Sequence, residues 1–136
     1  MKIFHKDGSL LLEVPGDTLR GANLRGTDLR GANFEGADLY CTNFAEAHLE
    51  GANFHGAFLH GAYMHHAHLE DANFQGANAC NLDLHNAHLQ RANFQDAYMQ
   101  CAHIYQANVE GADFRGATGT VHRVEVPNSW DTVEDI

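Results

Sequence analysis

The chain has 136 residues and a formal net charge of −10 with histidine neutral, a size that corresponds to one domain. Between Gly31 and Glu110, Arg91 is the single strongly basic residue against nine carboxylates; this argues against direct nucleic-acid binding, because lysines and arginines are needed to displace counterions from phosphates. No stretch approaches the roughly 20 apolar residues of a membrane helix, so we expect neither nucleic acid nor a membrane as partner.

The first 16 residues predict an N-terminal cap. Lys2–His5 reads as a strand, Asp7 and Gly8 as a turn, and Leu10–Val14 as a second strand. The apolar residues of such a hairpin would cover the end of a hydrophobic core, which a repeat protein needs.

Residues 17–118 consist of tandem five-residue repeats. From Leu24 to Phe114 every fifth residue is apolar, without a phase slip, and the residue two positions earlier is small in all but one repeat. The unit is A-(N/D)-(L/F)-x-x, as in Ala32–Gly36. A period of five fits neither a helix nor an ordinary strand. Glycines recur two positions after the central residue, where a type II turn needs positive φ. Each repeat therefore predicts a short extended segment followed by a turn.

A second period of twenty residues predicts how the segments stack. Phenylalanines recur at this spacing, and the other central residues form three more columns of the same period. Four repeats to a coil give an all-β solenoid of square cross-section with about five coils, each face contributing one inward column. One repeat departs from the pattern: Ala79 is small where the core wants a large side chain, and Leu82 is large where it wants a small one. We interpret the exchange as a local volume swap, which cores tolerate when total volume is kept.

Residues 119–136 predict a C-terminal cap or tail. Val121–Val126 reads as a strand, and Ser129 as the start of a short helical turn after Pro127. Trp130, Val133 and Ile136 would then cover the last coil. The whole chain, 1–136, is thus expected to form a single repeat domain.

The repeats over residues 17–118 resemble those of the pentapeptide-repeat family, whose motif is A(D/N)LXX. The resemblance implies a right-handed quadrilateral β-helix. Some members of that family resemble duplex DNA in shape and charge and act on DNA gyrase. Those members are longer rods that dimerise through an apolar C-terminal helix, whereas the C-terminal segment here is short and acidic.

A group of aromatic and histidine side chains forms the candidate binding surface. They are expected to point outward on two adjacent faces, where the motif usually has polar residues, and exposed aromatic residues are enriched in interfaces. We expect Phe58 and Tyr63 to flank one corner of the coil, with His60, His65 and His66 around it. The candidate residues are Tyr40, Phe58, His60, Tyr63, His65, His66, Tyr98 and Tyr105. The alternative is that these side chains only stack on one another as ordinary surface.

A column of three histidines, His48, His68 and His88, predicts a stacked polar ladder. Imidazoles about 4.8 Å apart would suit a shared metal ion, but a flat ladder does not favour tetrahedral geometry and no carboxylate or thiolate completes the set. We therefore expect no metal and no cofactor.

The three cysteines are odd in number and lack paired spacing, so we expect free thiols in a reducing compartment. Cys80 and Cys101 are expected on neighbouring coils, where a disulfide is geometrically possible. The N-terminus lacks the apolar segment of a signal peptide, so we expect a cytoplasmic protein.

No Ser–His–Asp or Cys–His motif supports catalysis. The sequence favours a non-enzymatic module that binds an unknown protein partner or a second copy of itself. The alternative is an acidic DNA mimic that inhibits or protects DNA gyrase or another DNA-binding enzyme. A third possibility is a metal- or ligand-binding module that uses the histidines.

Overall fold

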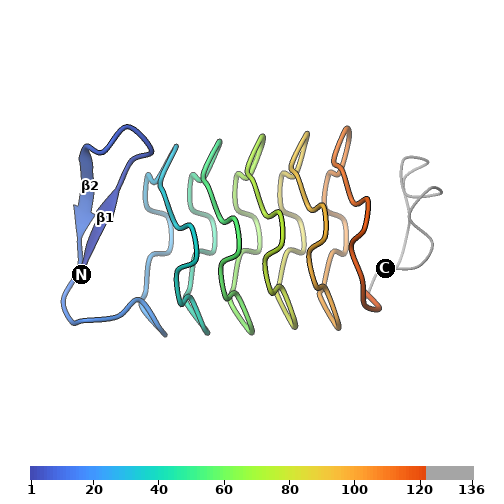
Figure 1. Cartoon of the computed structure of the whole chain (residues 1–136), viewed down its shortest axis with the longest axis horizontal. Coiled ribbons are helices and arrows are strands. Elements are labelled where there is room, and N and C mark those ends of the chain that lie inside the picture. Colours follow the sequence, from blue (N-terminus) through green and yellow to red (C-terminus); the bar gives the residue numbers. More distant parts are fainter. Residues whose placement is uncertain (122–136) are drawn as a thin grey trace.

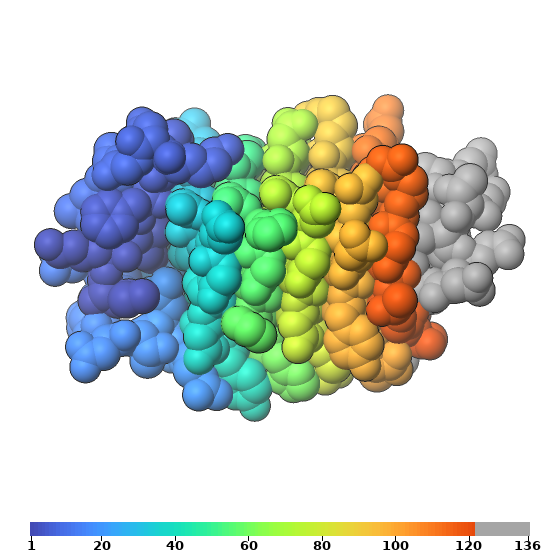
Figure 2. Space-filling view, in the orientation of Figure 1, coloured from blue at the N-terminus to red at the C-terminus, as the bar shows by residue number. Residues whose placement is uncertain are grey.

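The computed structural model describes residues 1–121 and shows a rod of stacked coils with a hairpin at its N-terminal end (Figure 1). The space-filling view shows successive coils in contact along the rod (Figure 2). No helix within residues 1–121 has the length and apolarity needed to cross a membrane. Of the expected C-terminal cap, residues 119–121 are described, and Val121 is buried. The rest of the predicted strand and the turn with Trp130, Val133 and Ile136 lie outside the described residues.

The N-terminal hairpin is confirmed. Strand β1 (Lys2–Phe4) pairs antiparallel with β2 (Leu10–Glu13). Asp7 closes the connection by accepting hydrogen bonds from the backbone N–H and hydroxyl of Ser9. The hairpin docks on the first coil because the Phe4 carbonyl accepts a hydrogen bond from the Asn33 N–H at 2.8 Å. Ile3 points into the core and is only 2% exposed, so the hairpin covers the first coil as predicted.

The twenty-residue coil is also confirmed. Parallel bridges join residues twenty apart along the rod, for example Asn53 to Asn33 on one side and to Asn73 on the other. The hydrogen bonds repeat with the same register: the Phe54 N–H donates to the Asn73 carbonyl at 2.7 Å, and the Asn73 N–H to the Ala52 carbonyl at 3.0 Å. Because each extended segment is so short, the coil-to-coil bonds hold the fold together as a ladder of single bridges.

Each corner is a hydrogen-bonded turn. The Ala57 N–H donates to the Phe54 carbonyl at 3.0 Å, and Gly56 between them has φ of 63°, as a type II turn requires. Within residues 1–121, ten non-glycine residues share this left-handed conformation at the equivalent position, at a cost of about 1–2 kcal/mol each. His66 is one of them, with φ of 58°, and its own N–H donates to the His85 carbonyl of the next coil. The coil-to-coil bond therefore holds a conformation that the residue alone would avoid.

The core consists of the four predicted columns, and we name each face of the rod by its first central residue. The Phe34 face contributes a phenylalanine stack, with ring centroids 4.5 to 5.1 Å apart and planes within 12°. Ala79 and Leu82 are both fully buried and remain joined by a turn hydrogen bond, so their exchange leaves the backbone intact. The faces have these columns: the Leu19 face, Leu19, Leu39, Leu59, Ala79 and Met99; the Leu24 face, Leu24, Phe44, Met64, Leu84 and Ile104; the Leu29 face, Leu29, Leu49, Leu69, Leu89 and Val109; and the Phe34 face, Phe34, Phe54, Phe74, Phe94 and Phe114.

Candidate functional site

The eight residues expected at the binding surface lie on the Leu19 and Leu24 faces, and we call them together the aromatic surface. Four of their rings are well exposed, from 41% for Tyr40 to 55% for Phe58. The other large apolar side chains exposed within residues 1–121 lie in the N-terminal hairpin. Along the coils, exposed aromatic rings are therefore concentrated on two adjacent faces. The aromatic surface comprises Tyr40, Phe58, His60, Tyr63, His65, His66, Tyr98 and Tyr105.

Phe58 and Tyr63 flank a single corner, as expected. The corner is the turn closed by the hydrogen bond from the Ala62 N–H to the Leu59 carbonyl, and His60 lies within it. The backbone on either side is fixed to the preceding coil, since the Phe58 N–H and the Tyr63 N–H each donate to a carbonyl there, at 2.9 and 3.0 Å. The two exposed rings thus project from rigid positions.

Across the coils, His60 stacks on Tyr40, with centroids 5.4 Å apart and planes within 10°. The guanidinium of Arg20 lies 4.8 Å from the centre of the Tyr40 ring, within the range of a cation–π contact. The edge of the aromatic surface nearest the N-terminal cap is therefore a stack of three planar groups from three successive coils.

The expectation that His65 and His66 share the Phe58–Tyr63 corner is wrong. They form the next turn along the chain, closed by the bond from the Ala67 N–H to the Met64 carbonyl. They lie on the far side of the Leu24 face because one repeat carries the chain across a whole face. The aromatic surface consequently spans two corners.

At that second corner the structure assembles a cluster of histidines around Asp83. His65 stacks on His85 at 4.9 Å, and His66 meets both rings edge-on. The Asp83 carboxylate contacts both stacked imidazoles, with Oδ1 2.6 Å from His85 Nδ1 and Oδ2 3.6 Å from His65 Nδ1. We name these four residues the Asp83 cluster. Asp83 was not predicted, although the twenty-residue period places it directly next to Tyr63.

Tyr98 and Tyr105 extend the surface two coils further. Tyr98 is in the same column as Phe58, separated from it by Asn78. Tyr105 contacts His103 with centroids 5.9 Å apart. The rings therefore form separate groups along the two faces, with polar residues between them.

Arginines near both ends of the described rod are paired with carboxylates. Arg20 lies 3.4 Å from Asp38, and Arg25 2.7 Å from Glu46. Hydrogen bonds from the Arg30 guanidinium lower the pKa of Asp28, and those from Arg115 lower the pKa of Asp113 to about 2. The lowered pKa values keep Asp28 and Asp113 ionised at neutral pH, and the arginine beside each of the four carboxylates largely balances its charge.

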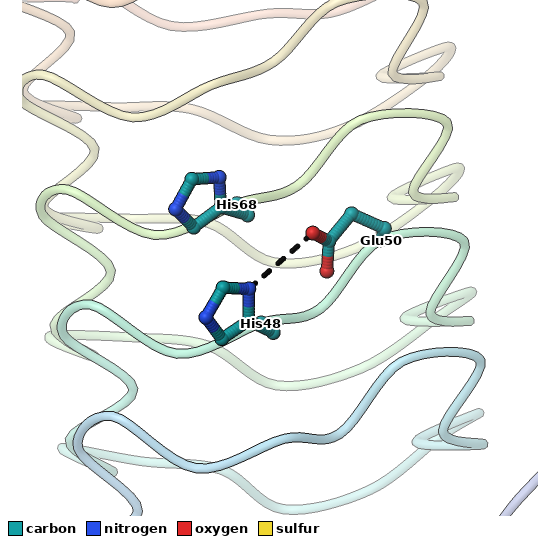
Figure 3. Close-up of side chains that lie close together, drawn as sticks. All are labelled: His48, Glu50 and His68. Carbon is teal, nitrogen blue, oxygen red and sulfur yellow. Dashed lines mark hydrogen bonds and ion pairs between the residues drawn. The ribbon is translucent and has the colours of Figure 1, made fainter.

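The histidine column on the Leu29 face stacks as predicted. The imidazoles of His48 and His68 are 4.7 Å apart and within 5° of parallel, and those of His68 and His88 are 4.6 Å apart and within 8°. The expectation that no carboxylate accompanies the column is wrong. Glu50 and Glu70 each follow a histidine by two residues and turn their carboxylates back toward the imidazoles. Figure 3 shows this arrangement for Glu50.

The cysteines Cys41, Cys80 and Cys101 are half-buried free thiols, as predicted.

Comparison with known proteins agrees with the repeat pattern. The family model for pentapeptide repeats matches the chain with eight copies, over residues 18–56, 42–78 and 81–116. A search of curated proteins finds no match.

Among solved structures, the chain is similar to a pentapeptide repeat protein from the thylakoid lumen of Arabidopsis thaliana, with 29% identity, a TM-score of 0.72, and coverage of 80% of this chain and 74% of that one. It is also similar to HetL, a pentapeptide repeat protein involved in heterocyst differentiation regulation in Nostoc sp. strain PCC 7120 (24% identity, TM-score 0.28, 71% and 61% covered). A third is QnrB1, a plasmid-mediated fluoroquinolone resistance protein (15% identity, TM-score 0.40, 85% and 82% covered). The family match and the first of these structures confirm the right-handed quadrilateral β-helix.

Proposed function

The chain belongs to the pentapeptide-repeat family, and we propose that it is a non-enzymatic module that binds a protein partner through its aromatic surface. The observation that carries this proposal is the grouping of four exposed rings on two adjacent faces of a rigid rod. Aromatic residues are the commonest energetic centres of protein interfaces.

The rigidity of the rod favours binding. Each ring is attached to backbone that is hydrogen-bonded to the neighbouring coils, and Tyr40 is further held by its stacking on His60. A surface that is already ordered loses little conformational entropy on association. Rings that would be passive on a flexible loop therefore become effective contacts here.

The charge of the chain indicates what kind of partner fits. The formal net charge is −10, and Asp83, whose ion-pair partners are His65 and His85, lies beside Tyr63. Complementary potentials steer association and suppress wrong partners. We therefore propose a protein whose docking surface is apolar at its centre and basic at its rim.

Replacing Phe58 and Tyr63 together by asparagine tests the proposal. Both substitutions restore the polar residue that the motif prefers, so the melting temperature should stay the same or rise slightly. Binding to the native partner, or self-association measured by sedimentation, should weaken by about 2 kcal/mol or more for each ring that acts as a hot spot.

The control is His55→Asn with Gln75→Asn, replacements of two polar side chains that follow central residues of the Phe34 face, which is opposite the Leu24 face and holds none of the aromatic surface. It should leave association unchanged. If Phe58→Asn with Tyr63→Asn binds as well as the parent protein in both assays, the rings are passive surface and the proposal is lost.

The acidic DNA mimic is the second candidate, favoured by the net charge of −10. Against it, Arg91 neutralises Asp71 with two hydrogen bonds of 2.8 and 3.0 Å, and the arginines near the ends of the rod pair with carboxylates as well. These pairs neutralise part of the acidic surface of the rod, which weakens its likeness to a phosphate backbone. In a gyrase supercoiling assay at low micromolar protein, we expect no inhibition and no protection. A clear effect would favour the mimic over the interaction module.

A further inference from the structure

The Leu29 face carries imidazoles and carboxylates in two adjoining columns. His48, His68 and His88 precede the central residues of three successive coils, and Glu50 and Glu70 follow those of the first two. The Glu50 carboxylate points at the edge of the imidazole stack (Figure 3). Two equivalent groups result, His48–Glu50–His68 and His68–Glu70–His88, with His68 in both.

The distances within these groups are short. His48 Nδ1 lies 3.4 Å from Glu50 Oε1, and His68 Nδ1 lies 3.8 Å from Glu70 Oε1. In each group, one ligand atom from every residue lies within 4.8 Å of the others. Nitrogen and oxygen ligands at 2.0–2.2 Å from a tetrahedral zinc ion are about 3.3 Å apart, so the histidine–glutamate spacing already matches.

The carboxylates are not committed to other partners. Glu50 Oε2 and Glu70 Oε2 are out of contact with solvent and have no hydrogen-bond partner within the described part of the chain. The neighbouring arginines are occupied elsewhere, Arg30 by Asp28 and Arg91 by Asp71. A buried carboxylate oxygen without a partner is costly, and a cation would satisfy it.

We propose that the Leu29 face binds one zinc ion through two stacked histidines and the glutamate between them. Two imidazoles and one carboxylate are a recurrent zinc ligand set, with water in the fourth position. The two imidazole nitrogens, at most 4.8 Å apart, have to approach each other by up to about 1.5 Å to reach the spacing of zinc ligands, and rotation about the broad His χ2 torsion brings them together. Because His68 belongs to both groups and presents one nitrogen to them, the ladder holds one ion per chain.

The Asp83 cluster is a different arrangement. There the carboxylate is already hydrogen-bonded to His85 Nδ1 at 2.6 Å, so a metal ion would have to displace an existing contact. On the Leu29 face the corresponding contacts are longer, a hydrogen bond of 3.4 Å between His48 and Glu50 and a distance of 3.8 Å between His68 and Glu70, and the second oxygen of each glutamate is unpartnered. The Leu29 face is opposite the Leu19 face and adjoins the Leu24 face at the corner that carries His65 and His66, but none of its histidines or glutamates belongs to the aromatic surface.

The test is zinc binding by the untagged full chain, followed by calorimetry and by elemental analysis after dialysis. All variants are made in a His85→Asn background, which removes one imidazole of the Asp83 cluster. His68→Asn breaks both groups and should weaken zinc binding by about tenfold or more, since even outer-sphere partners of a metal ligand are worth that much. His48→Asn and His88→Asn each leave one group intact and should retain one ion. Asparagine already occupies this column at Asn108, so the fold should tolerate each change.

Two further variants separate the proposed site from general metal adsorption. Glu50→Gln with Glu70→Gln keeps the imidazole stack and should weaken zinc binding as much as His68→Asn does. His55→Asn removes an exposed histidine that lies 3.6 Å from Glu35 on the Phe34 face and should change nothing. The proposal is overturned if zinc does not bind at 1 mM, or if His68→Asn binds it as well as the background protein.

Discussion

Phe74→Ala is expected to lower the free energy of unfolding by about 3–5 kcal/mol, as truncations of buried aromatic residues do. Phe74 is fully buried, and its ring stacks on Phe54 at 4.8 Å and on Phe94 at 4.5 Å. Removing it interrupts the stack from both sides. The gap cannot close by a shift of the backbone, because hydrogen bonds fix the spacing of the coils.

Asn73→Ala is the control for this truncation. Asn73 is only half-buried, and its Oδ1 accepts a hydrogen bond from the Gln75 N–H at 3.0 Å. Losing that bond should cost about 0.5–1.5 kcal/mol. Urea unfolding followed by circular dichroism measures both variants. Equal midpoints would mean that the inward and outward positions of the repeat have been assigned the wrong way round.

The fold was predictable from the sequence because two periods, of five and twenty residues, coincide. An apolar residue at every fifth position defines the inward column, and the recurrence of phenylalanine from Phe34 to Phe114 defines the coil. Each parallel bridge joins residues twenty apart, so any residue has its neighbours in the adjacent coils fixed by arithmetic. The same arithmetic places Asp83 beside Tyr63 and His85 beside His65.

The prediction was weaker for contacts within one coil. Glu50 reaches His48 because its side chain bends back over two residues. The period of the sequence does not predict which rotamer a long side chain adopts. His65 is only two residues from Tyr63 in the sequence, but it lies at the next corner of the rod because each repeat crosses a whole face. Left-handed conformations at non-glycine positions such as His66 and Arg91 also had no local signal, since the neighbouring coils impose them.

Leu82→Ala is expected to cost about 2–5 kcal/mol, in the range of buried leucine truncations. Leu82 is fully buried in a column otherwise occupied by alanine or threonine, and the fully buried Ala79 stands where the other repeats have a large side chain. If Leu82 fills the volume that Ala79 leaves free, truncating Leu82 opens a cavity that no neighbouring side chain fills. Thermal and urea unfolding of the single variant measure this loss.

The double variant Ala79→Leu with Leu82→Ala restores the regular motif and should be within about 1 kcal/mol of the parent protein, as volume-conserving exchanges are. Ala79→Leu alone should be destabilising by about 1–3 kcal/mol, because the added side chain meets Leu82 in a filled core. Residues that share one volume are non-additive in a double-mutant cycle, with coupling of about 0.5–3 kcal/mol. We expect a coupling at the upper end of that range. If the destabilisations of the two single variants simply add in the double variant, Leu82 and Ala79 occupy separate spaces, and the irregular repeat is tolerated for another reason.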